Sequence, residues 1–422
     1  MKGSGRYAGY RAGSFRNDLL SGFIVGIIAI PLGMAFAIAS GVKPEYGIYT
    51  TIVAGVLISV FGGSRYQIGG PTGAFVPVLL AVTLQYGYEG LLTAGMMAGV
   101  ILVALGLLKA GSFIRFMPQP VIIGFTSGIG VIIFAGQLPA FLGLDRIDKQ
   151  ESFLLNIKEM AVHLSSVNAY SIATAAIGFA GILLSRRYLP KVPASLVGLL
   201  ISAAAAVLLF DGRVETIGSL YGEIPNALPA LRIPELSLEL AGQLFVPALT
   251  IAMLGGIESL LSAVVADGMT GSRHNSNREL VGQGIANIVA PLFGGIPATG
   301  AIARTAANVK SSAASPVSGI VHALVVLGVL MAFAGYASRI PLASMAPILM
   351  VVAWNMSERR AFMGMLRARN GESLVLATTF LLTVFTNLTM AVLIGVAMSF
   401  ALFISRVRQQ RSDASVAEDA ES

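Results

Sequence analysis

Two stretches of this sequence repeat each other, FGGSRYQIGGPTGA at residues 61–74 and FGGIPATGA at residues 293–301. Each places Phe-Gly-Gly ahead of a Pro, a Thr and a Gly-Ala pair, at the start of a short apolar segment. Such interrupted segments at corresponding positions of two halves are typical of the binding site in transporters with an inverted repeat. The alternative is coincidence, because these tripeptides are frequent in a chain with 48 Gly.

The composition around these stretches is that of a membrane protein. Hydrophobic residues make up 55% of the chain and charged residues 12%, whereas a soluble domain carries about 25% charged residues. There is no Cys, and the three His residues are scattered, so we expect neither a metal site nor a cofactor. The net charge of +7 is explained by basic loops beside a membrane, and nucleic acid is not expected as a partner.

The apolar runs predict an all-α integral membrane protein with fourteen transmembrane segments. The first seven are 21–39, 46–61, 71–86, 90–110, 114–135, 168–185 and 193–210, within a first repeat over residues 21–212. The second seven are 243–266, 277–293, 299–311, 316–335, 339–352, 372–386 and 387–405, within a second repeat over residues 243–405. Because seven is odd, the halves have opposite orientations, and the repeated stretches open the third segment of each half.

The basic residues predict how the chain is oriented. With residues 1–20 in the cytoplasm, most of the 28 Lys and Arg fall on the cytoplasmic side, as the positive-inside rule requires. Residues 213–242 then form an extracellular connection, and residues 406–422 form a cytoplasmic tail that is polar, acidic and expected to be disordered. The prediction is a multi-pass protein of the cell inner (plasma) membrane with both termini cytoplasmic.

The two short segments predict a site for an anion. A helix that begins inside the membrane leaves its first N–H groups unpartnered, with the positive end of its dipole facing the same way. Two such starts that meet would hold a negative ligand between them through the amides of residues 73–75 and 301–303. The expected substrate-binding residues are Phe36, Thr72, Gly73, Ala74, Phe75, Thr299, Gly300, Ala301, Ile302 and Arg304. The two Thr hydroxyls are expected to donate to the ligand or to cap the helices.

Two charged residues lie inside these apolar segments. An isolated charge at a helix centre in the membrane costs ~2.5–3.5 kcal/mol or more, so each needs a function or a partner. Arg304 is expected to serve the anion. Glu258, with Ser262, is expected to hold the coupling ion, either a proton or, with backbone carbonyls, sodium. The simpler alternative is an ion pair between Glu258 and Arg304 that only fixes the packing.

Pro31 is expected to break the first segment near its middle, because Pro lacks the N–H that a helix uses. Together with Gly33, the break would place the ring of Phe36 beside the cavity.

Several longer stretches carry a family resemblance. They are PLGMAF (31–36), PEYGIY (44–49), GPTGA (70–74), GFTSGIG (124–130), ESLLSAVVAD (258–267), residues 274–284 and residues 296–309. With them the chain resembles the SulP family of sulfate permeases, also called solute carrier family 26, over about residues 15–405. The resemblance implies a core domain of segments one to four and eight to eleven, a gate domain of the remainder, and elevator-like transport of an anion.

Three further features concern the place of the chain within that family. Residues 302–309 and 352–358, together with Leu32, look closest to bacterial C4-dicarboxylate-type members, although many members have Gln where this chain has Leu32. Glu258 stands where cyanobacterial bicarbonate members tend to have Asp, which favours a proton over sodium. Most members continue into a STAS domain, which is absent from this sequence because it ends 17 residues after Ser405, so the sequence is either cut before that domain or belongs to a member without it.

The sequence therefore predicts a secondary active anion transporter and not an enzyme. Proton-coupled symport of a C4-dicarboxylate is favoured, with sulfate or bicarbonate as the other substrates considered. A sodium-coupled bicarbonate or sulfate transporter and an uncoupled channel or exchanger stay open, whereas a nucleobase–cation symporter fits Arg304 less well. The expected partners are the small anion, the coupling ion and the lipid bilayer, and a homodimer stays open.

Overall fold

The computed structural model describes residues 5–7, 10–111, 118–145, 147–190, 192–227, 231, 233–234, 237–386 and 390–404. Predictions for the other residues, including disorder in the tail over residues 406–422, lie outside the described residues.

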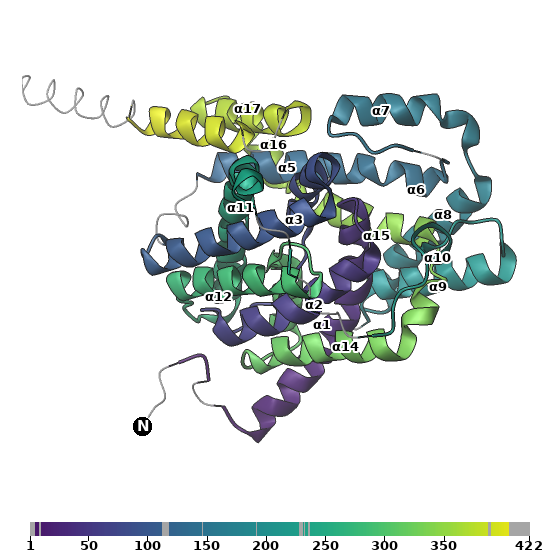
Figure 1. The fold of residues 1–422 in the computed structure, drawn as a ribbon, viewed down its shortest axis with the longest axis horizontal. Coiled ribbons are helices and arrows are strands. Elements are labelled where there is room, and N and C mark those ends of the chain that lie inside the picture. Colours follow the sequence, from purple (N-terminus) through teal and green to yellow (C-terminus); the bar gives the residue numbers. More distant parts are fainter. Residues whose placement is uncertain are drawn as a thin grey trace, which may run out of the picture.

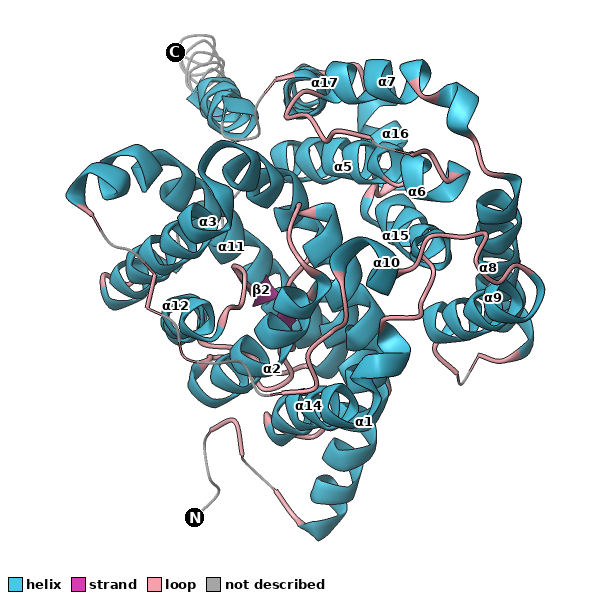
Figure 2. Ribbon diagram, turned by 45° about the vertical axis from the view of Figure 1, so that its right-hand side comes forward, coloured by secondary structure: helices cyan, strands magenta, loops and turns pink. Residues whose placement is uncertain are grey.

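The described chain is a bundle of helices (Figures 1 and 2). The first half holds α1 (Ala12–Ala39), α2 (Pro44–Phe61), β1 (Gly69–Gly70), η1 (Gly73–Phe75), α3 (Val76–Leu107), α5 (Gln119–Gly136), α6 (Leu138–Leu142), α7 (Phe153–Val162), η2 (Leu164–Ser166), α8 (Ala169–Tyr188), α9 (Ala194–Leu209) and α10 (Ile217–Tyr221). The second half holds α11 (Leu238–Thr270), α12 (Ser276–Val289), η3 (Ala290–Phe293), β2 (Thr299–Gly300), α13 (Ile302–Lys310), α14 (Val317–Ala337), α15 (Leu342–Met356), α16 (Arg359–Arg367), α17 (Gly371–Phe385) and a last helix, Met390–Ile404.

The fourteen predicted segments are confirmed as helices. Seven helices among the described residues are long and apolar enough to cross a membrane, and three shorter helices are also apolar. Two predicted segments share α3, which is divided at Gly87, where the backbone has φ 70° and leaves helical geometry. The predicted tenth segment is a short strand followed by the nine-residue helix α13. The fold is therefore all-α, with seven segments in each of two inverted halves.

One prediction about the first segment is wrong, because Pro31 lies inside α1, which continues through it to Ala39. The helix itself begins at Ala12, before the predicted apolar segment over residues 21–39. In its N-terminal part the carboxylate of Asp18 accepts hydrogen bonds from the amides of Ala314 and Ser315 and from the Ser315 hydroxyl. These partners come from the loop before α14 and compensate for the burial of Asp18.

The helices form two groups, and each group combines segments from both halves of the chain. In one group α1 packs on α2 and α14, and α3 packs on α11 and α12. In the other group α5 packs on α15 and α17, and α15 packs on α8, which also packs on α9. The contact of α2 with α12 in the first group and that of α5 with α15 in the second join corresponding segments of the two halves. We call these groups the core and the gate, and Figure 1 shows α8 and α9 apart from α3 and α12.

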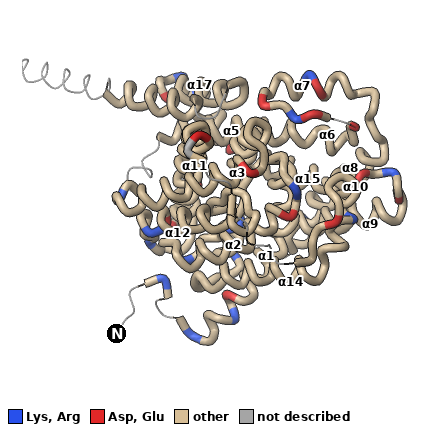
Figure 3. Tube along the Cα trace, viewed as in Figure 1, with Lys and Arg blue, Asp and Glu red and all other residues tan. Residues whose placement is uncertain are grey.

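Close backbone contacts hold the core together. A Cβ on Gly99 of α3 would lie 2.7 Å from the carbonyl oxygen of Gly284 in α12, and a Cβ on Gly284 would lie 2.6 Å from that of Gly99. Only glycine at both positions allows this crossing, which is the packing expected between helices that cannot rely on hydrophobic exclusion. Figure 3 shows Lys, Arg, Asp and Glu mainly at helix ends and loops, with long uncharged stretches between them.

Candidate functional site

The two repeated stretches meet in the middle of the molecule. Residues Gly69–Gly70 pair with residues Thr299–Gly300 as antiparallel strands, with Gly69 opposite Gly300 and Gly70 opposite Thr299. Figure 2 shows β2 among α2, α11 and α12. Backbone that leaves helical geometry inside a membrane protein must find partners within the protein. The two non-helical stretches, residues 69–70 and 299–300 (the two breaks), partly satisfy each other's backbone hydrogen-bonding groups, which fixes the helix starts that follow them.

The first helix start is η1, which follows Thr72 and leads into α3, and the second is α13, which follows Ala301. The amides of a first helical turn have no partner within the helix and act as donors for a negative group. Gly73 and Ala74 from the first start line one cavity together with Ile302 and Ala303 from the second. The two starts therefore face the same space. The expectations for the amides of Phe75 and Ala301 are wrong, because the Phe75 amide donates to the carbonyl oxygen of Thr72 at 3.3 Å and the Ala301 amide donates to that of Ile68 at 2.8 Å.

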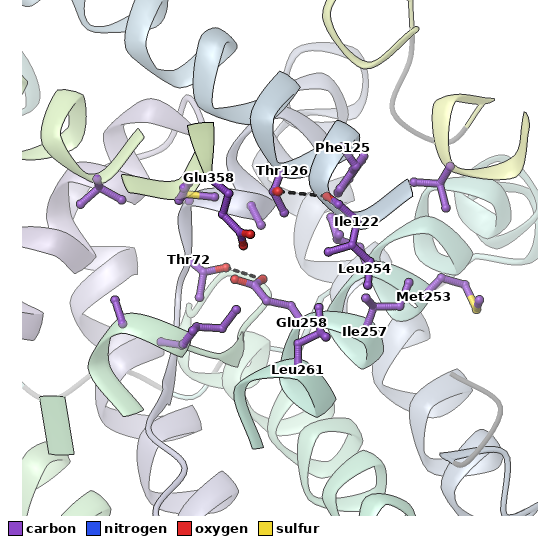
Figure 4. A pocket seen from close by; sticks show the side chains of 18 of the residues that line it. Thr72, Ile122, Phe125, Thr126, Met253, Leu254, Ile257, Glu258, Leu261 and Glu358 are labelled. Atoms are coloured by element: carbon purple, nitrogen blue, oxygen red, sulfur yellow. Dashed lines mark hydrogen bonds between the residues drawn. The ribbon is translucent and has the colours of Figure 1, made fainter. Parts of the chain in front are cut away.

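That cavity has a volume of about 390 Å³ and is predominantly apolar (Figure 4). Core and gate both contribute to its wall. From the core come residues of α1 and α11 with the two helix starts, and from the gate come residues of α5, α15 and the last helix. The lining residues are Leu32, Phe36, Thr72, Gly73, Ala74, Val121, Ile122, Phe125, Thr126, Leu249, Thr250, Met253, Leu254, Ile257, Glu258, Leu261, Ala301, Ile302, Ala303, Arg304, Val352, Asn355, Met356, Glu358, Val392 and Leu393.

Arg304 brings a positive charge to this cavity from the first turn of α13. Its side chain is 3% exposed, and Nη2 donates to the carbonyl oxygen of Pro71 at 2.5 Å. Its Nη1 is buried and has no hydrogen-bond partner among the described residues. Gly70 makes room for this group, since a Cβ there would lie 2.8 Å from Nη1. A guanidinium nitrogen without a partner is a ready donor for an anion.

Glu258 lies on α11 and also lines the cavity. Its Oε2 accepts a hydrogen bond from the hydroxyl of Thr72 at 2.8 Å, which Figure 4 shows as a dashed line. Among the described residues, no contact within 4.0 Å joins Glu258 to Arg304. The alternative of a structural ion pair is therefore wrong. Thr72 caps η1 by position only, because its side chain makes no capping hydrogen bond.

Four residues expected in the site lie behind the cavity wall. Thr299 is fully buried, and its hydroxyl bonds to Ser259 Oγ at 2.7 Å and donates to the Gly255 carbonyl oxygen at 3.1 Å. The amide of Gly300 donates to Ser259 Oγ. The Oγ of Ser262 donates to the hydroxyl of Thr305 at 3.1 Å. Phe75 is only 1% exposed and lies beside Gly255. These contacts fasten the two breaks to α11.

Sequence reasoning missed two polar residues at the gate side of the cavity. Asn355 lies near the end of α15, and Glu358 lies in the bend between α15 and α16. Figure 4 shows the carboxylate of Glu358 pointing toward the Thr72–Glu258 pair from the other side. A signal existed, because Glu358 follows directly on an apolar segment. Its direction depends on a backbone with φ 35°, which the sequence does not reveal.

Comparison with known proteins is consistent with this geometry. The model of the Sulfate permease family matches residues 15–379. The “Putative sulfate transporter YvdB” of Bacillus subtilis (strain 168) is 58% identical over 409 residues, which are 97% of this chain and 77% of that protein. The solved transmembrane domain of the cyanobacterial bicarbonate transporter BicA is 33% identical, with a TM-score of 0.81, over 91% of this chain and 97% of that one. The murine solute carrier 26 family member A9, an anion transporter in the inward-facing state, shares the fold at 20% identity, with a TM-score of 0.84 over 93% of this chain and 68% of that one.

Proposed function

Because this chain belongs to the Sulfate permease family, whose named relatives carry anions across membranes, we propose that it couples the uptake of a small anion to a proton. The observation that carries the proposal is the donor set at the cavity. The unpartnered Arg304 Nη1 and two helix starts face a space that also holds two carboxylates, of which Glu258 lies beside the helix starts through its bond to Thr72 and Glu358 lies on the gate side.

The site attracts the anion through the orientation of its hydrogen-bond donors as well as through its positive charge. Helix N-termini are worth about 0.3–1 kcal/mol each to a nearby negative charge, and more where the site is partly buried. The guanidinium adds a planar fork that suits carboxylates and other oxyanions. The surrounding wall is apolar, so the ligand has few other polar groups to choose from, and these donors determine where it binds.

The proton follows from the placement of Glu258. Ionised, its carboxylate accepts the Thr72 hydroxyl and faces the same electropositive region as the anion. Once an anion occupies Arg304, that carboxylate meets a second negative charge in a poorly solvated space, which favours its protonated form. Binding of anion and proton is then mutually favourable, and by linkage each raises the affinity for the other equally. Joint binding followed by joint release is symport.

For the substrate we favour a C4-dicarboxylate. One of its carboxylates would bind the donors at one end of the site, and its methylene groups suit the apolar wall contributed by α5 and α11. Sulfate is the competing substrate, on the strength of the name of the 58% identical relative. Uptake of radiolabelled succinate, sulfate and bicarbonate into proteoliposomes, with and without a pH gradient, separates these candidates. Proton coupling would be refuted if an imposed sodium gradient drove uptake of the anion and a pH gradient drove none.

Glu258→Gln tests the role of the carboxylate directly. Gln resembles the protonated acid and cannot release a proton. The variant should still exchange labelled for unlabelled anion, yet fail to accumulate it when an inward pH gradient is applied. Ser262→Ala is the matched control from the same helix, because Ser262 bonds to Thr305 and lies outside the cavity wall. Uphill accumulation by Glu258→Gln at the wild-type level would exclude Glu258 as the carrier.

We further propose that the core slides past the gate in an elevator-like movement that carries the anion. In support, the helix starts and Arg304 lie in the core, while α5 and α15 of the gate close the other side of the cavity. The chain has no Cys, so spin labels attach only where Cys is introduced. Labels at Gly268 in the core, where a Cβ meets nothing within 4 Å, and at the 55% exposed Leu184 in the gate should report a shifted distance distribution when anion is added. One distribution under all conditions would refute this movement.

A further inference from the structure

A second concavity lies next to the transport cavity, where α15 turns into α16. It has a volume of about 870 Å³ and is open to the outside of the bundle. We call it the arginine hollow and define it by its lining residues, which are Trp354, Asn355, Glu358, Arg359, Arg360, Ala361, Met363, Gly364 and Arg367. Neither the transport site nor the packing of α16 accounts for three arginines in one hollow.

The arginine hollow carries a surplus of positive charge. Three arginines and one glutamate line it, and all four side chains are exposed. In the part of the chain that the structure describes, no carboxylate lies within 4.0 Å of Arg359, Arg360 or Arg367. The guanidinium of Arg359 lies over the ring of Trp354, 3.5 Å from its centroid. This stacking orients one arginine while its N–H groups stay free at the rim of the ring.

The arginine hollow and the transport cavity share part of their walls. Asn355 and Glu358 line both spaces. Glu358 holds φ 35° and ψ 43°, a left-handed conformation that costs a non-glycine residue about 1–3 kcal/mol and is often retained at functional positions. The conformation separates α15 from α16 and turns the carboxylate toward the cavity (Figure 4), while the next residue, Arg359, stacks in the hollow.

We propose that the arginine hollow is a second anion site on the cytoplasmic side, which holds a small divalent oxyanion as it passes Asn355 and Glu358 between the transport cavity and the cytoplasm. The inference rests on the proposed function, because it names where the transported anion is held outside the transport cavity. Charges of one sign at the rim of a cleft raise the local concentration of an oppositely charged ligand and its rate of association. The single carboxylate of Glu358 at the shared wall keeps that anion from binding too tightly to move on.

The sole tryptophan of the chain makes the arginine hollow directly observable. Trp354 is the only Trp in 422 residues and is 52% exposed under Arg359. The full chain in nanodiscs of phosphatidylcholine is titrated with sodium sulfate at constant ionic strength, and the fluorescence of Trp354 is recorded. We expect a saturable change. The proposal would be overturned if sodium chloride at the same ionic strength produced the same fluorescence change, or if sulfate produced no saturable change.

Two variants assign that signal to one of the two sites. Arg360→Gln/Arg367→Gln leaves the stacked Arg359 in place and should raise the half-saturating sulfate concentration about tenfold or more, since hydrogen bonds to charged groups are lost. Arg304→Ala should leave the Trp354 response unchanged, because Arg304 lines only the inner cavity. An unchanged response in the double variant, or a lost response in Arg304→Ala, would assign the signal to another site and overturn the proposal.

An anionic lipid headgroup offers the same phosphate chemistry from a different source. The titration is therefore repeated in nanodiscs that contain phosphatidylglycerol. We expect sulfate to remain effective there. If phosphatidylglycerol alone produced the full fluorescence change and sulfate added nothing, the arginine hollow would be a lipid site, and its role for the transported anion would be refuted.

Transport kinetics test the role for the anion independently. The orientation predicted from the basic residues places the loop between segments 339–352 and 372–386, which contains α16, in the cytoplasm. In everted membrane vesicles, which expose that side, Arg360→Gln/Arg367→Gln should raise KM for the transported anion several-fold with kcat unchanged. In right-side-out vesicles KM should stay at the wild-type value. Arg186→Gln/Arg187→Gln, at the exposed end of α8, is the matched control for lost positive charge. If no anion is transported by the wild type, the proposed function fails, while the Trp354 titration still decides whether the second site exists.

Discussion

Replacing Arg304 by alanine removes the only positively charged side chain that lines the transport cavity among the described residues. In the protein it donates through Nη2 to the Pro71 carbonyl oxygen, and its Nη1 has no partner. The substitution therefore takes away one internal hydrogen bond and the donor that we assign to the anion. The first loss concerns the fold, and the second concerns the ligand, so the two can be measured separately.

The size of each effect follows from these contacts. A hydrogen bond to a charged group contributes about 1.5–3 kcal/mol, so anion affinity should fall by about 10- to 150-fold. The Pro71 carbonyl left without its donor costs about 1–3 kcal/mol, offset in part because a buried charge no longer has to be desolvated. We expect a modest fall in Tm and a monodisperse protein. Arg304→Lys should recover part of the affinity, because a point charge cannot reproduce the guanidinium fork.

Binding of the labelled substrate to purified protein, by scintillation proximity, measures the affinity, and thermal unfolding in the same detergent measures the fold. Lys310→Ala is the matched control, because Lys310 is an exposed cation at the other end of the same helix. Its affinity should lie within about twofold of the wild type, a difference of less than half a kcal/mol. A well-folded Arg304→Ala protein that binds the anion as tightly as the wild type would refute the assignment of Arg304.

Three further outcomes are expected. A Cβ added at Gly73 would lie 2.9 Å from Met356 Sδ and 3.3 Å from the Phe36 ring at the cavity. In Gly73→Val we therefore expect uptake to be lost while Tm stays near the wild-type value. Normal uptake would show that the anion binds elsewhere. Gly300→Ala puts a Cβ 1.6 Å from Gln67 Nε2, so it should lower stability by about 1–3 kcal/mol through overpacking, and an unchanged Tm would contradict the packing described. His322→Leu replaces a fully buried ring whose nitrogens have no partner among the described residues, and Tm should rise, whereas a clear fall would show that water or a ligand satisfies the ring.

The sequence was sufficient to predict the segments and the meeting of the two helix starts at one cavity, because both depend on local pattern. Apolar runs and their breakers mark the helices, and the repeated stretches at residues 61–74 and 293–301 mark the two helix starts that line the cavity. The symmetry argument also predicted that the breaks meet, and they do so as paired strands. These inferences needed no knowledge of which side chain touches which.

The remaining details depended on partners that are distant in sequence. Thr72 and Thr299 occupy equivalent places in the two repeats, yet only Thr72 reaches the cavity, because Thr299 turns toward Ser259 on α11. Asp18, in the N-terminal part of α1, is buried because it accepts hydrogen bonds from amides of a loop almost 300 positions later. Periodicity contains no information about such partners, so sequence patterns treat Thr72 and Thr299 alike and do not predict the burial of Asp18.

One helix, α11, connects the two halves of the site through consecutive residues. Ser259 holds the second break, since its Oγ accepts the Gly300 amide and bonds to the Thr299 hydroxyl. Glu258 holds the first break through Thr72, the residue from which η1 begins. The bond to Thr72 is charge-assisted only while Glu258 is ionised, and such bonds are about twice as strong as neutral ones. We therefore expect protonation of Glu258 to loosen the first helix start while the second stays fixed. The two halves of the site differ chemically, and on the proposed function that difference would link a proton to the geometry of the amides that receive the anion.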